Sequence, residues 1–171
     1  MNSALILVDL HDNEVGTESK EQVHKKALLH RAFSVFIIDG DKMLLQKRAC
    51  GKYHSGGLWT NACCSHPRSG ENLPDAVARR LTEELGISCP AREIGSFVYF
   101  ADFQSVYEYE YDHVFLGEYS GTIQPDPDEI AETRWMTIEE IQADLRSHPH
   151  RYTQWFITAF PMVLKHIQAS K

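Results

Sequence analysis

The segment 59–67 (WTNACCSHP) holds the residue types and the spacing best suited to a reactive site. Cys64 and His66 are two positions apart, so in an extended segment their side chains point the same way and can face one site. Two other interpretations are open: a buried thiol beside a surface histidine, and a structural zinc site that also uses Cys63. The zinc site needs further ligands at finger-like spacing, and the two remaining cysteines do not supply them.

A second candidate site lies where three acidic residues alternate with three tyrosines in the predicted strand 106–117. On a strand, the carboxylates then share one face and the tyrosines share the other. Carboxylates on one face repel each other unless a cation or a proton lies between them, so the pattern indicates a polar site; the other interpretation is a solvated sheet face. The tyrosine face is expected to pack on the core. The alternating residues are Tyr107, Glu108, Tyr109, Glu110, Tyr111 and Asp112.

Histidines near the start of the first core strand add to this pattern. His24 and His30 are six positions apart. Imidazole nitrogens together with carboxylate oxygens suit Mn²⁺, Zn²⁺ or Fe²⁺ better than Ca²⁺. Each histidine alone is also compatible with an incidental position. Taken jointly, the residues predict one metal site with five ligands, His24, His30, His66, Glu108 and Glu110.

The third candidate is a charged helix. Apolar residues at four-residue steps predict a helix over 72–85, and Gly86 is a typical C-terminal stop. Arg80 and Glu84 are four positions apart on one face of this helix. By itself this spacing also fits a simple ion pair that contributes about 0.2–0.5 kcal/mol. The apolar positions are Leu73, Val77, Leu81 and Leu85.

The composition limits what such sites can bind. The chain has 171 residues, of which 17 are basic and 24 acidic, so its formal charge is −7. This surplus of acid argues against nucleic-acid binding, which depends on dense Lys and Arg. Any anionic ligand therefore needs locally placed cations or a bound metal. The four cysteines, two of them adjacent, do not form a disulfide framework and are expected as reduced thiols.

Length and hydropathy predict one compact domain. Apolar residues make up 43% and charged residues 24% of the chain, which is the ordinary globular balance. The longest apolar stretches, 5–8 and 35–38, are far shorter than the ~20 residues that span a bilayer. Residues 1–10 lack a basic start and a small-residue cleavage site, so we expect a cytoplasmic protein without a membrane segment.

The remaining segments supply a sheet and two more helices. The predicted strands cover 29–38, 42–47, 93–103, 106–117 and 132–136. The first two form a hairpin through a turn at 39–41. Thr137 and Glu140 form a capping-box pattern at the start of a short helix, and 152–168 predicts a helix that is bent or restarted at Pro161. Mixed strands with three helices indicate a layered α/β or α+β domain.

The helix 72–85 resembles the second half of the Nudix box. In that motif a Gly is followed after five residues by Glu, and after seven more by Arg-Glu-hydrophobic-any-Glu-Glu-any-Gly-hydrophobic. The matching residues are Glu71, Arg79, Glu83, Glu84, Gly86 and Ile87. Ser65 stands in place of the Gly, and Arg80 in place of the Glu that follows the Arg. In Nudix hydrolases that Glu helps to bind metal and activate water, so Arg80 argues against hydrolysis and suits a bound, uncleaved diphosphate.

From about Lys20 to Trp155 the chain resembles the metal-dependent, flavin-free isopentenyl-diphosphate isomerases. The resemblance rests on this helix, on WTNACCSHP, on the two histidines followed by Arg-Ala-Phe-Ser, and on the Glu-Tyr-Glu triplet at 108–110. It implies a Nudix-like mixed β-sheet domain flanked by helices, covering 1–171, with segment 1–28 and helix 152–168 packed on it. It also implies interconversion of isopentenyl and dimethylallyl diphosphate, in isoprenoid biosynthesis, by a 1,3 proton shift through a carbocation.

The family's site residues carry over position by position. The implied catalytic residues are Cys64, Glu110 and Tyr99. A tightly held Mn²⁺ or Zn²⁺ has the ligands His24, His30, His66, Glu108 and Glu110. A Mg²⁺ that meets the diphosphate is bound by Glu84 and the backbone carbonyl of Cys64, and no flavin is implied. The residues around the substrate are Lys20, Arg48, Lys52 and Arg80 at the diphosphate and Trp155 over the hydrocarbon.

Other interpretations stay open for single residues and for the whole chain. Each cation alone also fits solvated surface charge, and a lone Trp155 also fits core burial. The resemblance implies a small-molecule diphosphate as partner, no nucleic acid or membrane, and a monomer or homodimer. The competing functions are a Nudix-type nucleoside diphosphate hydrolase, which would release phosphate products, and a non-catalytic module that binds metal or diphosphate.

Overall fold

One mixed sheet of nine strands organises residues 4–170, the part of the chain that the computed structural model describes. Residues 1–3 and 171, at the ends of the predicted 1–171 domain, lie outside the described residues. The strands are β1 (Leu5–Val8), β2 (Glu14–Glu18), β3 (His30–Asp39), β4 (Lys42–Arg48), β5 (Trp59–Thr60), β6 (Cys63–Ser65), β7 (Ala91–Asp102), β8 (Tyr107–Glu118) and β9 (Ile130–Thr137). Strand β3 is central, because it pairs in parallel with β8 and antiparallel with β1, β4 and β6. The predicted hairpin of β3 and β4 is confirmed.

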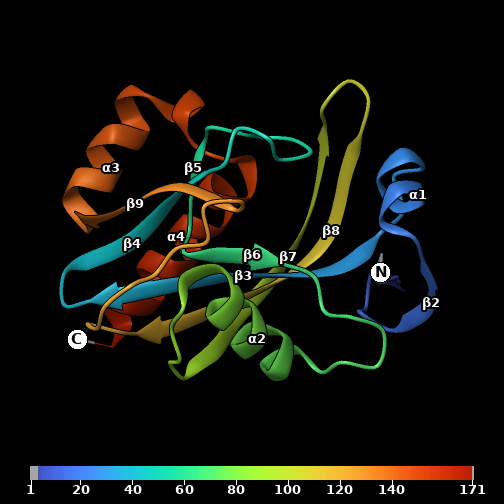
Figure 1. Cartoon of the computed structure of the whole chain (residues 1–171), viewed down its shortest axis with the longest axis horizontal. Helices are drawn as coiled ribbons and strands as arrows, with labels where there is room; N and C mark the ends of the chain where they lie inside the picture. Colours follow the sequence, from blue (N-terminus) through green and yellow to red (C-terminus); the bar gives the residue numbers. More distant parts are fainter. Residues whose placement is uncertain (1–3, 171) are drawn as a thin grey trace.

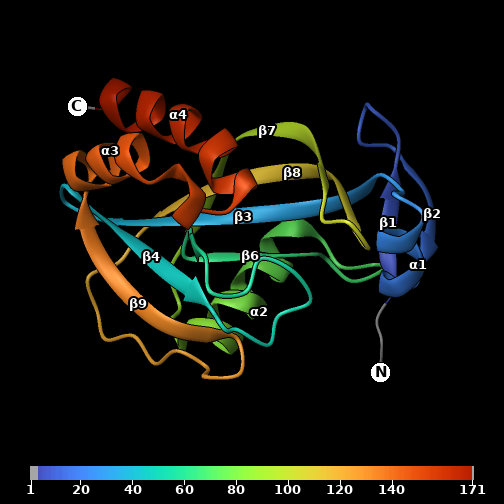
Figure 2. The same cartoon turned by 90° about the horizontal axis from the view of Figure 1, so that it is seen from above.

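Helices cover both faces of this sheet. They are α1 (Lys20–Lys25), α2 (Leu73–Leu85), α3 (Ile138–Ser147) and α4 (Gln154–Ala169), with a 3₁₀ turn, η1, at Pro149–Arg151. Figure 1 shows β7 and β8 as a long hairpin that rises beside α1. Figure 2 shows α2 on one side of β3 and α3 with α4 on the other. The layered α+β architecture that the sequence predicts is confirmed.

The two faces of β3 belong to two apolar cores. On one face, Phe33, Val35 and Ile37 pack with Leu81 and Leu85 of α2. The opposite face packs on α4 through Phe36, Ile38, Phe156, Phe160 and Val163. Since side chains alternate along a strand, every residue of β3 is assigned to the α2 side or the α4 side by its position. This alternation also decides which side chains of the neighbouring strands can meet.

Helix α1 is an element that the sequence prediction missed, so the chain has four α-helices within residues 4–170 rather than three. Ser19 caps its start, accepting a hydrogen bond from the Gln22 amide. The helix has only six residues, and Val23 is its one buried apolar side chain, so no apolar periodicity marks it. Its existence depends on packing at the end of the sheet.

Helix α4 continues through Pro161, so the predicted restart does not occur. Pro161 is exposed, while Phe156 and Phe160 before it and Val163 after it are buried in the same core. Burial of both halves on one sheet face offsets the hydrogen bond that an interior proline removes. Among the described helices, none combines the length and the apolar character that crossing a membrane requires.

The end of α2 yields a stability prediction. Gly86 has a φ of 63° and its amide caps the carbonyls of Leu81 and Thr82, and an added Cβ would lie 3.0 Å from Gln124 Cβ. Gly40, in the β3–β4 turn, has nearly the same φ of 61° but open space around it. We expect Gly40→Ala to lower the free energy of unfolding by about 1 kcal/mol through backbone strain, and Gly86→Ala to lower it further through the added contact. Urea denaturation of both variants measures this, and equal losses would contradict the role given to Gln124.

Candidate active site

The register of β6 on β3 separates the two adjacent cysteines. Cys63 lies opposite Val35 and is fully buried in the α2 core, whereas Cys64 lies opposite Ser34 on the other face. Cys64 contacts the small cluster that contains Tyr99, and it lines the main cavity. Cys64 is therefore the cysteine that can meet a ligand. His66 lines the same cavity, as the two-residue spacing predicts.

The acidic face of β8 is buried, which corrects the prediction that the tyrosine face packs on the core. Glu108, Glu110 and Asp112 are between 1% and 7% exposed, and the three tyrosines that alternate with them are half-buried. The acidic face continues along the strand into Val114 and Leu116, which pack under α4. The polar site and the apolar core thus occupy successive stretches of one strand face.

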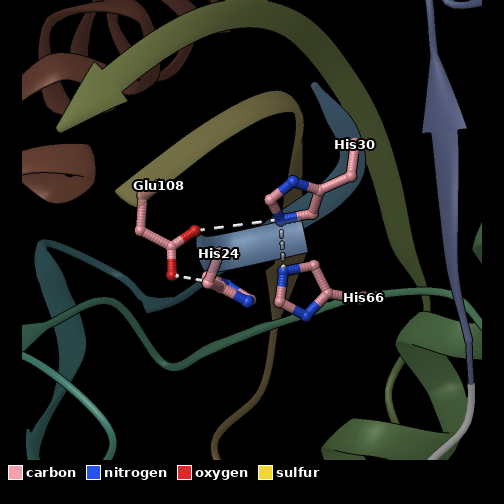
Figure 3. Close-up of side chains that lie close together, drawn as sticks. All are labelled: His24, His30, His66 and Glu108. Carbon is pink, nitrogen blue, oxygen red and sulfur yellow. Dashed lines mark hydrogen bonds and ion pairs between the residues drawn. The ribbon is translucent and has the colours of Figure 1, made fainter. Parts of the chain in front are cut away.

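Three imidazoles converge on these carboxylates from three different elements. Figure 3 shows His24 from α1, His30 from β3 and His66 after β6 grouped with Glu108. One ligand atom from each of the four lies within 4.8 Å of the others. Glu110 adjoins the group, with its Oε1 2.9 Å from His66 Nε2 and 3.5 Å from His30 Nε2. The five residues predicted as ligands are therefore brought together.

The hydrogen bonds of the histidines fit a bound cation. Nδ1 of His24 lies 2.6 Å from the Lys20 carbonyl, and Nδ1 of His30 lies 2.9 Å from the Leu28 carbonyl. Each Nδ1 thus carries the proton, and each Nε2 lone pair points inward. His24 Nε2 lies 3.0 Å from Glu108 Oε1, and both His24 Nε2 and Glu108 Oε2 are buried with no hydrogen-bond partner among residues 4–170. Lone pairs that face one another in a buried space need a cation or a proton between them, and the mixed nitrogen and oxygen donors suit a transition metal. No cysteine belongs to this group, which leaves the alternative zinc site at Cys63 and Cys64 without support.

Two neighbouring carboxyl groups on β8 have opposite electrostatic environments. Burial raises the pKa of Asp112 well above its usual range, and the negative charge of Glu110 raises it further. Burial would also raise the pKa of Glu110, but the neighbouring His30 and His66 hold it well below the usual range. Burial therefore disfavours the charged form of Asp112, which accepts a hydrogen bond from Ser34, whereas its neighbours favour the charged form of Glu110.

Tyr99 is held against Glu110 by the β7–β8 register. The two residues are direct cross-strand partners, and the Tyr99 hydroxyl donates a 2.8 Å hydrogen bond to Glu110 Oε2. Burial and the nearby carboxylate raise the pKa of Tyr99 well above its usual range, so the phenol keeps its proton. The sequence-based choice of Tyr99 as the partner of Glu110 agrees with this contact.

A cavity of about 480 Å³ opens beside these groups. Its volume lies in the range of small-molecule sites. The cations predicted to surround a diphosphate all line it, and burial together with the charge of Lys52 lowers the pKa of Lys20. Of the thirteen predicted site residues, those on its wall are Lys20, Arg48, Lys52, Cys64, His66, Arg80, Tyr99, Glu108, Glu110 and Trp155. His24, His30 and Glu84 are buried behind the wall.

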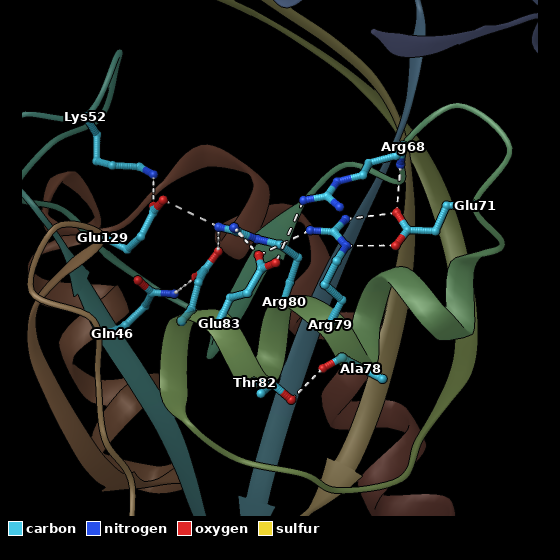
Figure 4. Close-up of polar contacts among 11 residues, drawn as sticks. Gln46, Lys52, Arg68, Glu71, Ala78, Arg79, Arg80, Thr82, Glu83 and Glu129 are labelled. Atoms are coloured by element: carbon cyan, nitrogen blue, oxygen red, sulfur yellow. Dashed lines mark hydrogen bonds and ion pairs between the residues drawn. The ribbon is translucent and has the colours of Figure 1, made fainter. Parts of the chain in front are cut away.

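The motif helix α2 presents a chain of ion pairs to one end of the cavity (Figure 4). Arg80 pairs with Glu84 in the i,i+4 contact that the spacing allows, and it also reaches Glu83 and Glu129. Arg79 makes a two-bonded contact with Glu71, at 2.7 and 2.9 Å, which anchors the loop before the helix. Of the two adjacent arginines, Arg80 therefore pairs with the buried Glu84, and Arg79 pairs with Glu71.

Glu84 is nearly fully buried, and burial raises its pKa against the opposing charge of Arg80. Gln46 lies 3.4 Å from Glu84 Oε2 and 2.7 Å from the Ala62 carbonyl, so it links the helix to the segment before β6. This bond holds Glu84 near the strand that carries Cys64.

Trp155 is positioned by the start of α4. Thr153 caps the helix, and its hydroxyl donates a 2.8 Å hydrogen bond to Thr60, on the segment that precedes β6. The Arg48 guanidinium lies 5.1 Å from the centre of the Trp155 ring, and Arg48 Nη1 is 4.0 Å from Cys64 Sγ. The Trp155 ring therefore forms part of the cavity wall near Cys64, and the Arg48 guanidinium makes a cation–π contact with it.

Among the cavity residues that sequence reasoning missed, His54 and Glu129 make contacts with predicted site residues. Glu129 follows the 125–128 turn and pairs with Lys52 and Arg80, while His54 contacts Glu108 from the loop after β4. Neither residue belongs to a recognised motif or to a periodic pattern. Their place in the site follows only from contacts with residues that are distant in the sequence, such as Glu108 for His54 and Lys52 for Glu129.

The fold and the motif helix place the chain in a class of proteins. The NUDIX domain model matches residues 28–156. A crystal structure from Deinococcus radiodurans has a TM-score of 0.70 at 21% identity and covers 85% of this chain and 90% of that one. The MutT NUDIX hydrolase from Burkholderia pseudomallei has a TM-score of 0.64 at 22% identity, covering 79% and 98%. The protein has the Nudix fold, as the motif predicts.

Relatives with higher sequence identity narrow the class. A protein of Photorhabdus laumondii named isopentenyl-diphosphate Delta-isomerase 2 is 47% identical over 158 residues, 91% of this chain and 89% of the relative. The isopentenyl-diphosphate Delta-isomerase of Serratia proteamaculans is 45% identical over 160 residues, 92% and 89% of the two chains. The chain therefore belongs, within the Nudix proteins, to the isopentenyl-diphosphate Delta-isomerase family, and it is an enzyme. The resemblance seen in the sequence is confirmed.

The Cys64 thiol gives a prediction on reactivity. Burial raises the pKa of Cys64 to about 12, although Arg48 opposes this rise. At pH 8 the thiolate fraction is then about 10⁻⁴, and the thiolate is the species that alkylates. We expect iodoacetamide to modify Cys64 at least ~100-fold more slowly than the exposed Cys50 at pH 8, with the Cys64 rate rising about tenfold per pH unit up to pH 9.5. Peptide mass spectrometry follows both residues in one sample. A Cys64 rate that reaches a plateau below pH 9 would show a thiolate and contradict the expectation.

Proposed function

We propose that this enzyme interconverts isopentenyl diphosphate and dimethylallyl diphosphate by a 1,3 proton shift. The observation that carries the proposal is the identity of 45–47%, over most of both chains, to proteins named isopentenyl-diphosphate Delta-isomerase. The site supports it independently, because Cys64, Glu110 and Tyr99 line a single cavity together with the four cations expected around a diphosphate. Its place is isoprenoid biosynthesis.

The reaction requires a strong proton donor and a wall that does not trap a cation. An unactivated alkene is a very weak base, so its protonation at C4 needs a well-placed acid and an environment that stabilises positive charge at C3. Loss of a proton from C2 on the other side completes the shift. Cys64 and Glu110 are the two proton-transfer groups in this proposal, and Tyr99 sets the proton affinity of Glu110 through their hydrogen bond. The ring of Trp155 stabilises the carbocation without offering a nucleophile.

Two divalent ions complete the proposed site. His24, His30, His66, Glu108 and Glu110 would hold a Mn²⁺ or Zn²⁺, whose charge would favour proton release from the Glu110 side. Glu84 and the Cys64 backbone carbonyl would hold a Mg²⁺ at the diphosphate. No flavin takes part. The convergent inward lone pairs of the histidines support the first site, and the burial of Glu84 beside Arg80 supports the second.

The diphosphate is held by Lys20, Arg48, Lys52 and Arg80 in this proposal, and these side chains share one cavity. Arg80 stands where a Nudix hydrolase has a metal-binding glutamate, so this end of the cavity binds a diphosphate without activating water against it. The ligand is a small molecule rather than nucleic acid, in keeping with the charge of −7. We infer that the enzyme works in the cytoplasm, as a monomer or homodimer, with 1–171 as one catalytic unit.

Incubation with isopentenyl diphosphate, Mg²⁺ and Mn²⁺ in D₂O, followed by proton NMR, tests the reaction. We expect dimethylallyl diphosphate to form with incorporated deuterium, because the shift exchanges a proton with groups that equilibrate with solvent. Intact substrate together with turnover of a nucleoside diphosphate panel would point to the hydrolase instead. Metal uptake with no turnover of any substrate would point to a binding module.

The same assay distinguishes the two cysteines. Cys64→Ala should lower kcat by about 10²–10⁴-fold, the range for a group that transfers a proton. Cys63→Ala should retain kcat within about threefold, because Cys63 faces the α2 core rather than the cavity, and should mainly lower stability. An inactive Cys63→Ala beside a normal Cys64→Ala would show that the assignment is wrong.

The metal site yields a separate prediction. Glu108→Gln should raise the dissociation constant for Mn²⁺ by more than about 100-fold, beyond the range for outer-shell partners, because a buried charged ligand is lost. Activity should fall with metal content measured by mass spectrometry. Glu132→Gln, which removes an exposed carboxylate on β9, is the matched control. Retained metal with lost activity would assign Glu108 a direct role in proton transfer.

A further inference from the structure

The loop 49–58, which carries Lys52, closes over the metal cluster through His54. The loop is fixed at both ends of a short arc, because the Arg48 backbone bonds to Gly57 and Leu58 and Arg48 Nη2 donates a 3.2 Å hydrogen bond to the His54 carbonyl. Gly56 has no room for a side chain, since a Cβ there would lie 2.7 Å from the Cys50 carbonyl oxygen. The arc therefore has one defined shape, and His54 projects from it into the cavity.

The His54 ring is held on all sides. It stacks on Phe103 at 4.6 Å with an interplanar angle of 14°, and its edge meets Trp155 at 5.9 Å. Nδ1 lies 3.1 Å from the Ser55 hydroxyl, and Nε2 contacts Glu108 Oε1 directly. With the Ser55 hydroxyl donating to Nδ1, the ring proton lies on Nε2 and is donated to Glu108.

The contact from His54 reaches the Glu108 oxygen that also meets His24. Oε1 accepts from His54 and lies 3.0 Å from His24 Nε2, while Oε2 has no hydrogen-bond partner among residues 4–170 and lies 3.8 Å from His30 Nε2. A carboxylate whose one oxygen is fixed by a donor keeps both of its oxygens in a defined direction. Donors of this kind orient metal ligands and raise the affinity of a site.

We propose that His54 is a positioning residue of the metal site: its Nε2–H fixes Glu108 Oε1 and so holds the carboxylate in place beside His24 and His30. The proposal rests on the metal site of the proposed function. His54 joins that site to the Lys52 loop and to the wall formed by Trp155 and Phe103. A shift of the 49–58 loop would therefore move His54, and with it the Glu108 carboxylate at the metal site.

Two variants separate the donor from the ring. His54→Gln can place an amide Nε2–H near Glu108, whereas His54→Phe keeps the stacking on Phe103 and loses the donor. The metal-free proteins are titrated with Mn²⁺, and free Mn²⁺ is counted by electron paramagnetic resonance. We expect His54→Phe to bind Mn²⁺ about 10–100-fold more weakly and His54→Gln to stay within about threefold of the unaltered protein. Cys50→Ser, an exposed change on the same loop, should leave the affinity unchanged.

The results distinguish a hydrogen-bonding role of His54 from a role of its ring in packing. Unchanged affinity in His54→Phe would overturn the proposal, and so would equal losses in His54→Phe and His54→Gln, because the ring rather than the donor would then be responsible. Thermal denaturation of the metal-free variants checks that all of them fold. Glu108→Gln measured in parallel keeps the two proposals apart. If it also binds Mn²⁺ normally, the proposed metal site itself fails, and if it alone loses Mn²⁺, only the role of His54 fails.

Discussion

The burial of acidic side chains on β8 is the constraint around which this protein is built. An ionised carboxylate removed from water costs several kcal/mol unless charges and hydrogen bonds compensate. The strand meets this cost in two ways. Burial disfavours the charged form of Asp112, which accepts a hydrogen bond from Ser34, while Glu108 and Glu110 lie among imidazoles. The space between these groups suits a cation because carboxylate oxygens and imidazole nitrogens converge there.

The rest of the fold brings groups to that strand face. The parallel register of β3 and β8 places His30 opposite Glu110, and the antiparallel register of β7 places Tyr99 opposite the same residue. His24 arrives from the other direction, on a short helix that follows the β1–β2 hairpin. That hairpin is tied to the sheet by Asp12, which accepts hydrogen bonds from Arg31 and contacts His113. The N-terminal segment therefore contributes one of the four residues of the His/Glu cluster.

The cavity also shows how an acidic protein can prepare a site for an anion. Its cations are already paired with carboxylates: Lys52 with Glu129, and Arg80 with Glu83, Glu84 and Glu129. These pairs hold long side chains in place before a ligand enters, which lowers the entropy cost of binding. The Nudix helix carries charged groups to one end of this cavity, and Arg80 is the residue that departs from the motif there.

Local signals were enough to predict much of the fold and to group several of the residues that meet at the cavity. Asn72 and Gly86 mark the ends of α2, and Thr137 with Glu140 marks the start of α3, because caps are made within one turn of the chain. Alternation along β8 grouped Glu108 with Glu110 correctly, since side-chain direction in a strand is a local property. The spacing to His66 favoured Cys64, and the pairing of β6 with β3 agrees by placing Cys64 at the cavity. Which face of β8 is buried was decided by packing on α4. Helix α1, His54 and Glu129 also depend on partners far away in the sequence. A short segment carries no record of such partners, so only the tertiary structure could decide these features.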